Sequence, residues 1–116
     1  MGKELITGIS SGHFEWKSFP EMFRRCRDEY GFDLIEIWSE QIGYPPDRQT
    51  CVQLRKLAKS FGILLGYHAP LYGDHDLAHR DPARAGIVLR EVLRICGRIG
   101  VSYLVVHLGN NPDRER

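Results

Sequence analysis

The chain has 116 residues and a mass of 13.4 kDa, which is enough for one domain with a modest hydrophobic core. Its 42% hydrophobic and 27% charged residues are typical of a globular protein. A net charge of +1 gives no electrostatic reason to expect nucleic-acid binding, and no apolar segment approaches the roughly 20 residues of a membrane helix. The N-terminus lacks the apolar core of a signal peptide. We therefore expect a single cytoplasmic domain over residues 1–116 with no membrane contact.

A strand–helix–strand unit is predicted at the start of the chain. Residues 5–9 and 33–38 are short apolar runs with β-branched side chains, which is typical of strands. Between them, Ser18 and Glu21 form a capping-box pattern that predicts the beginning of a helix. Gly31 then marks the expected end of that helix.

The same order of elements is repeated in the middle of the chain. Thr50 and Gln53 form a second capping-box pattern, and we expect the helix that follows to end at Gly62. The apolar face of this helix consists of Cys51, Leu54, Leu57, Ala58 and Phe61. Residues 63–67 then predict a third strand.

A third helix and a fourth strand complete the pattern. Asp81 as N-cap and Pro82 in the first turn predict the beginning of the helix, and Gly100 predicts its end. The side chains expected to be buried are Ala85, Val88, Leu89, Val92, Cys96 and Ile99. Residues 103–106 form the predicted fourth strand.

The three cysteines lie far apart in the sequence and form no CxxC pair. Cys26, Cys51 and Cys96 each fall on the apolar face of a predicted helix. We expect reduced, buried thiols rather than a disulfide or a zinc site.

The order β-α-β-α-β-α-β predicts an α/β fold with four parallel strands and three helices, joined by right-handed crossovers. Two architectures satisfy this order, a doubly wound sheet and part of a (β/α) barrel. The segment GISSGHF after the first strand has neither the GxGxxG spacing nor the lysine of a phosphate-binding loop, which counts against a nucleotide-binding doubly wound fold. In both architectures the carboxyl ends of the strands form the functional rim.

Two of the predicted strands lead directly into a histidine at this rim. His68 follows one apolar run and His107 follows another, and strand alternation places both on the same face of the sheet as Glu36. We therefore expect the two histidines to lie close together, with Glu36 one layer deeper. Because an unpaired carboxylate in an apolar strand is costly, Glu36 is expected either to form a structural hydrogen bond to a neighbouring strand or to belong to the site.

Several segments resemble the xylose isomerase-like TIM-barrel superfamily. These are FDLIEIW at the second strand, HAP after the third, DLAHRDPAR before the third helix and GVSYLVVHLG at the fourth strand. The superfamily contains sugar and sugar-phosphate isomerases and epimerases, and the endonuclease IV-type enzymes of AP endonuclease family 2. The resemblance covers nearly the whole chain and corresponds to the first four of eight β/α units, that is, the N-terminal half of a barrel.

The resemblance implies roles for particular residues. In the endonuclease IV branch, histidines matching His68 and His107 bind zinc together with a glutamate from a later strand. In the isomerase and epimerase branch, the metal is held mainly by later strands and these histidines shape the substrate pocket. Two imidazoles leave a zinc ion two ligands short of a tetrahedral site, so we expect zinc or manganese to bind weakly to the isolated chain.

Further candidate residues lie around the same rim. We interpret Glu36 and His68 as catalytic residues, and His13, Trp38 and Tyr72 as substrate-binding residues. The histidines and aspartates of the loop over residues 74–79 match no compact coordination pattern, and we interpret them as solvated.

The resulting hypothesis is a half-barrel related to metal-dependent sugar or sugar-phosphate isomerases and epimerases, inactive as an isolated monomer. An endonuclease IV-like zinc phosphodiesterase acting on abasic DNA is one alternative, and a catalytically silent folding or assembly module is another. Because four strands cannot close a TIM-type barrel, we expect homo-oligomers that bury the inward side chains Leu34, Leu64 and Val105, or else a flattened sheet with helices on both sides.

Overall fold

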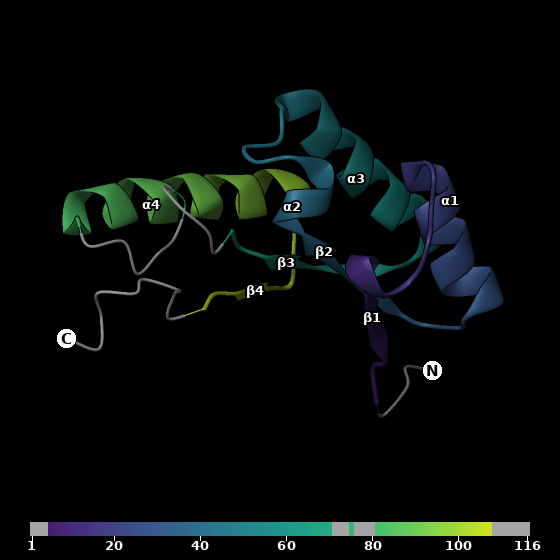
Figure 1. Ribbon diagram of the computed structural model, residues 1–116. Helices are drawn as coiled ribbons and strands as arrows, with labels where there is room; N and C mark the ends of the chain where they lie inside the picture. Colours follow the sequence, from purple (N-terminus) through teal and green to yellow (C-terminus); the bar gives the residue numbers. More distant parts are fainter. Residues whose placement is uncertain (1–4, 71–74, 76–80, 108–116) are drawn as a thin grey trace.

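The computed structural model describes residues 5–70, 75 and 81–107. Within them, four strands form one parallel sheet in the order β1-β2-β3-β4 (Figure 1). Their bounds are β1 Gly8–Ser10, β2 Leu34–Trp38, β3 Leu64–His68 and β4 Tyr103–Val105. The parallel strands and their order along the chain confirm the α/β fold predicted from the alternation of elements.

The helices connect successive strands. Their bounds are η1 Ser11–His13 (a 3-10 turn), α1 Phe19–Arg24, η2 Arg25–Glu29 (a π-helical continuation of α1), α2 Ser39–Ile42, α3 Arg48–Phe61 and α4 Pro82–Ile99. The three predicted helices correspond to α1 with its continuation, to α3 and to α4. The sequence analysis did not anticipate the single turn of α2, which is too short to show an apolar period.

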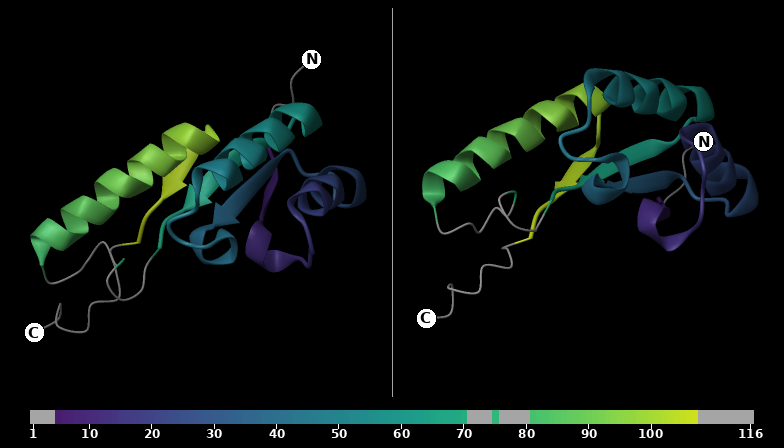
Figure 2. Two further views of the ribbon diagram at one scale, coloured as in Figure 1. Left: turned by 90° about the horizontal axis from the view of Figure 1, so that it is seen from above. Right: turned by 45° about the horizontal axis from the view of Figure 1, so that its top comes forward.

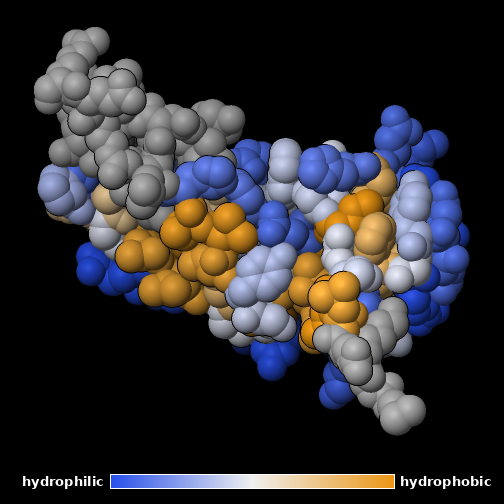
Figure 3. Space-filling model, turned by 90° about the horizontal axis from the view of Figure 1, so that it is seen from below, coloured by the Kyte–Doolittle hydropathy of each residue, from blue (hydrophilic) through white to orange (hydrophobic). Residues whose placement is uncertain are grey.

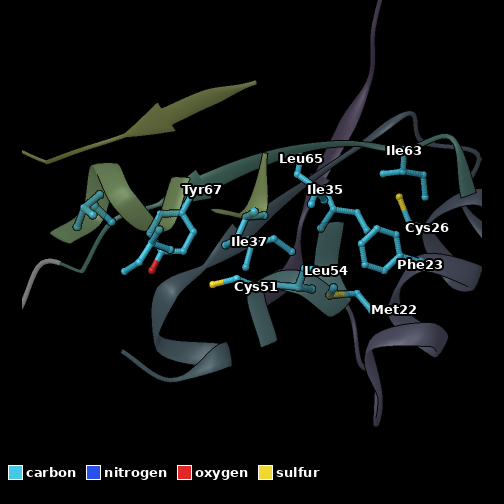
Figure 4. Close-up of a cluster of buried hydrophobic side chains, with 14 of the residues drawn as sticks. Met22, Phe23, Cys26, Ile35, Ile37, Cys51, Leu54, Ile63, Leu65 and Tyr67 are labelled. Atoms are coloured by element: carbon cyan, nitrogen blue, oxygen red, sulfur yellow. The ribbon is translucent and has the colours of Figure 1, made fainter. Parts of the chain in front are cut away.

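The helices lie on one face of the sheet, and the opposite face is open (Figures 1 and 2). Side chains of β2 and β3 that point towards the helices alternate with those that point to the open face, so Ile35, Ile37, Leu65 and Tyr67 are buried in the core (Figure 4). From the helices, Met22, Phe23, Leu54, Val92 and Ile99 close this core. The alternative expectation of a flattened sheet with helices on both sides is therefore wrong for the described residues.

Most helix ends have the predicted caps. The Ser18 hydroxyl accepts a hydrogen bond from the Glu21 amide at 3.3 Å, and Asp81 Oδ1 accepts one from the Ala83 amide at 3.0 Å. The prediction that α3 begins at Thr50 was wrong. Its N-cap is Asp47, whose Oδ1 accepts from the Thr50 amide at 2.7 Å, so the helix begins at Arg48 and Thr50 lies inside its first turn.

Two further expectations require correction. The first strand is Gly8–Ser10 rather than residues 5–9, because the ladder starts where Gly8 meets Leu34, the first residue of β2. In α4, Leu89 is 41% exposed, whereas Ile95, which the prediction omitted, is 2% exposed. The buried stripe of α4 consists of Val88, Val92, Ile95 and Ile99.

Cys26 and Cys51 are buried and Cys96 is half-buried, and all three are free thiols as expected. Burial raises the pKa of the Cys26 thiol to about 11, and a coulombic contribution from Asp33 adds to the effect. No helix within the described part of the chain is long and apolar enough to cross a membrane.

Candidate functional site

The two strand-end histidines are in direct contact at the rim. His68 ends β3 and His107 follows β4, and their Nε2 atoms lie 2.9 Å apart. His68 Nδ1 lies 3.1 Å from the Ala69 carbonyl oxygen, which can only accept a hydrogen bond. In the neutral pair, His68 therefore carries its proton on Nδ1, and His107 Nε2–H donates to His68 Nε2. The predicted juxtaposition of the two histidines is thus confirmed.

Aromatic rings form a continuous row along the rim from β1 to β4. The ring centroids of His13 and Trp38 are 5.9 Å apart, those of Trp38 and His68 are 5.7 Å apart, and those of His68 and His107 are 4.8 Å apart. We call these four side chains the ring row. The row combines aromatic faces with imidazole nitrogens, which is the mixture of apolar and directional polar groups typical of small-molecule sites.

The turn after β1 is fastened to the end of β2 by a buried serine. The Ser11 hydroxyl accepts a hydrogen bond from the Trp38 amide at 3.0 Å, and it also bonds to the Gln41 side chain. The Ser11 carbonyl accepts from Trp16 Nε1 at 2.9 Å. Gly12 lies directly on the Trp38 indole, where a Cβ atom would come within 3.0 Å of the ring. These contacts fix the positions of His13 and Trp38 relative to each other. No sequence motif had identified Ser11 as the residue that does this.

Glu36 lies one layer below the ring row, in the middle of β2. The Tyr103 hydroxyl donates a hydrogen bond to Glu36 Oε1 at 3.0 Å. Both residues line a hollow of about 430 Å³ on the open face of the sheet, together with Ser10 and His13. The carboxylate therefore has a structural hydrogen bond, although its partner lies on β4 and not on a strand next to β2, and the site role of Glu36 stays a prediction.

The described residues bring together five of the six predicted site residues. His13, Trp38, His68 and His107 form the ring row, and Glu36 lies one layer below it. Tyr72 lies outside the described residues. The sequence analysis missed Tyr103, although Gly66 inside an apolar strand was a signal of a close approach at this position.

The imidazole nitrogens of the two histidines are suitable ligands for a divalent metal ion, but two ligands are too few for a complete site. The two Nε2 atoms are adjacent, and His68 donates its Nδ1 proton to a backbone carbonyl, as metal-binding histidines commonly do. A metal ion would have to replace the hydrogen bond between the two Nε2 atoms. Within residues 5–70, 75 and 81–107, however, no three His, Cys, Asp or Glu side chains gather closely enough to hold a metal ion. His68 and His107 can therefore supply two ligands of an incomplete site.

The chain matches known proteins in structure but not in sequence. No protein-family model matches the sequence, and no curated protein matches it. The fold matches a crystal structure of D-psicose 3-epimerase in the presence of D-fructose, with a TM-score of 0.69 and 20% identity. It also matches D-psicose 3-epimerase with D-tagatose from Clostridium cellulolyticum H10, with a TM-score of 0.67 and 18% identity.

These matches cover 86% of this chain but only 36% of each epimerase, so the chain spans about a third of their length. The four parallel strands in sequential order are half the number of strands in an eight-stranded barrel. The chain therefore has the fold of part of a β/α barrel like that of these epimerases, which agrees with the partial barrel predicted from the sequence.

Proposed function

We propose that this chain is a half-barrel of a metal-dependent sugar isomerase or epimerase, and that it binds a ketose sugar or sugar phosphate along the ring row. The observation that carries the proposal is the contact between His68 and His107 at the carboxyl ends of two neighbouring strands. This edge is where barrels of this kind hold their reacting groups. The likeness of the fold to epimerase structures solved with D-fructose and D-tagatose supports the choice of ligand class.

The residues present suit proton transfer beside a carbonyl group. Such a reaction needs a group that takes the proton and a group that stabilises the negative charge on the oxygen. In this proposal Glu36 transfers the proton, His68 serves the reaction through the metal that it would help to hold, and His13 and Trp38 contact the substrate. A divalent ion held in part by His68 and His107 would polarise the substrate oxygens. Because the described residues bring only these two ligands together, we expect no turnover by the monomer.

Assembly of two chains would complete the barrel. The sheet leaves the outer edges of β1 and β4 unpaired within the described residues. The face seen from below carries apolar patches (Figure 3), and Leu64 and Tyr103 are exposed. Two copies related by a two-fold axis along the barrel could pair β4 of one with β1 of the other, with all eight strands parallel. We propose a second copy of this chain as the occupant of the open face.

The endonuclease alternative lacks comparable support, because the matched structures are sugar epimerases. The remaining alternative, a silent assembly module, predicts a folded chain that binds no sugar. A binding measurement therefore separates the first proposal from both alternatives.

The test is a titration of the chain with D-fructose, followed by NMR, for the wild type and two variants. His107→Ala removes half of the histidine pair and should weaken binding at least about tenfold. His75→Ala is the matched control. The His75 ring packs against Tyr44, with centroids 4.8 Å apart, and Tyr44 interacts with Glu91 of α4, on the helix side of the sheet. Equal affinities of the two variants, or no binding by the wild type, would overturn the proposal.

A further inference from the structure

Glu36 belongs to a row of residues that crosses the open face of the sheet. In the strand register, Ser10 pairs with Glu36, Glu36 pairs with Gly66, and Gly66 pairs with Tyr103. Glu36 and Tyr103 thus lie on strands that are not neighbours, with β3 between them. Their hydrogen bond therefore has to span the strand that carries Gly66.

The absence of a side chain at Gly66 makes this contact possible. A Cβ atom at this position would lie 2.2 Å from Tyr103 Cζ and 2.6 Å from its hydroxyl oxygen. Both distances are far below van der Waals contact, so the tyrosine ring occupies the space that any side chain at position 66 would fill. Gly66 therefore leaves the space through which the Tyr103 side chain reaches Glu36.

The hydrogen bond leaves one carboxylate oxygen of Glu36 available. The Tyr103 hydroxyl donates to Oε1, and no other hydrogen bond to the Glu36 carboxylate is found among the described residues. Glu36, Tyr103, Ser10 and His13 line the same hollow of about 430 Å³, and Glu36 is half-buried there. An ionised carboxylate accepts hydrogen bonds only, so its natural partner in the hollow is a hydroxyl or another donor of a ligand.

The Tyr103 phenol stays protonated over the physiological range. Burial, followed by the hydrogen bond to Glu36, raises the pKa of Tyr103 to about 12. Tyr103 is consequently a permanent donor towards Glu36.

We propose that Tyr103, seated over Gly66, is a positioning residue that holds Glu36 with its second carboxylate oxygen towards the hollow, where it accepts a hydrogen bond from a hydroxyl group of the sugar. This inference rests on the proposed function and adds a hydroxyl-binding subsite one layer below the ring row. Tyr103 acts through Glu36 and does not itself contact the reacting carbon.

The test is a double-mutant cycle that measures D-fructose affinity by NMR titration of the wild type, Tyr103→Phe, Glu36→Gln and the double variant. Tyr103→Phe removes only the hydroxyl and should weaken binding about three- to tenfold. In the Glu36→Gln background the same substitution should have a clearly smaller effect, because a neutral amide oxygen accepts more weakly from Tyr103 and from the sugar than a carboxylate does. Tyr30→Phe is the matched control, since the Tyr30 hydroxyl bonds to Arg25 at 2.7 Å in the helix layer.

The outcomes separate this inference from the proposed function. If wild-type affinity is unchanged by Tyr103→Phe but falls in His107→Ala, the positioning role is wrong and the sugar site stands. Additive losses from Tyr103→Phe and Glu36→Gln would also contradict positioning, because a merely structural tyrosine acts independently of the carboxylate. If the wild type binds no sugar, both proposals fail together.

Discussion

The imidazoles of His68 and His107 share one contact, Nε2 to Nε2 at 2.9 Å, although 39 residues separate them in the sequence. Each histidine lies at the carboxyl end of its strand, and β3 and β4 are neighbours in the sheet. Parallel pairing therefore converts two distant strand ends into one pair of converging nitrogen atoms.

The histidine pair should bind zinc or manganese weakly. Two imidazole nitrogens give a definite but incomplete donor set, so calorimetry with each metal alone should detect weak binding that His107→Ala abolishes. His75→Ala should bind like the wild type. Tight one-to-one binding by a monomeric chain would contradict this expectation, since it would require ligands that the described residues do not bring together.

Gly66→Ala should destabilise the chain by about 1–2 kcal/mol. The new methyl group would force the Tyr103 ring away and break its hydrogen bond to Glu36, which leaves the half-buried carboxylate without that partner. The free energy of unfolding from urea titrations measures this cost. In a Tyr103→Ala background the cost should disappear.

Gly97→Ala provides the matched control for this substitution. A Cβ atom at Gly97 meets nothing within 4 Å, and the residue lies inside α4, so alanine should stabilise the chain by about 0.5–1 kcal/mol. Equal changes in the free energy of unfolding for the two substitutions would show that the space left by Gly66 has no structural consequence.

The sequence predicted the fold well because each element carried local signals. Glycines at the helix ends, caps such as Ser18 and Asp81, and the alternation of apolar runs all depend on neighbouring residues. The boundaries of β1 and α3 were missed because they depend on a partner strand and on a choice between two capping side chains.

The candidate site was predicted only in part. Strand parity was sufficient to place His68, His107 and Glu36 on one face. The hydrogen bond from Tyr103 to Glu36 could not be predicted from the alternation of side chains along a strand. It crosses β3 and depends on the absence of a side chain at Gly66. The anchoring of the β1 turn by Ser11 likewise depends on a contact with the distant Trp38 amide.

Stability should fall at alkaline pH. The pKa of Cys26 is raised from 9.0 to about 11 and that of Tyr103 from 10.0 to about 12, so the fold favours the neutral form of both groups. Their contribution to the free energy of unfolding is complete below the pKa values that the two groups have in the unfolded chain. It is lost as the pH rises from about 9 to about 12. The free energy of unfolding should therefore be nearly constant between pH 7 and 9 and decrease above it. Tyr103→Phe should reduce the decrease between pH 10 and 12, and an unchanged profile in this variant would contradict the assignment.

The chain should self-associate through its open face. Light scattering over a concentration series should approach twice the 13.4-kDa mass of one chain. Leu64→Lys places a charge on this face and should shift the equilibrium towards the monomer. Leu93→Lys makes the same change on an exposed position of α4 and should have no such effect. A wild-type chain that stays monomeric at high concentration would rule out the two-fold barrel.

The most direct test of the proposed site follows the imidazole resonances of a ¹⁵N-labelled chain during addition of D-fructose. If the sugar binds along the ring row, the signals of His13, His68 and His107 should shift together with one dissociation constant, while those of His75 stay unchanged. Shifts confined to His75 or to the helix layer would contradict a sugar site at the strand ends. So would the absence of any shift up to the solubility limit of the sugar.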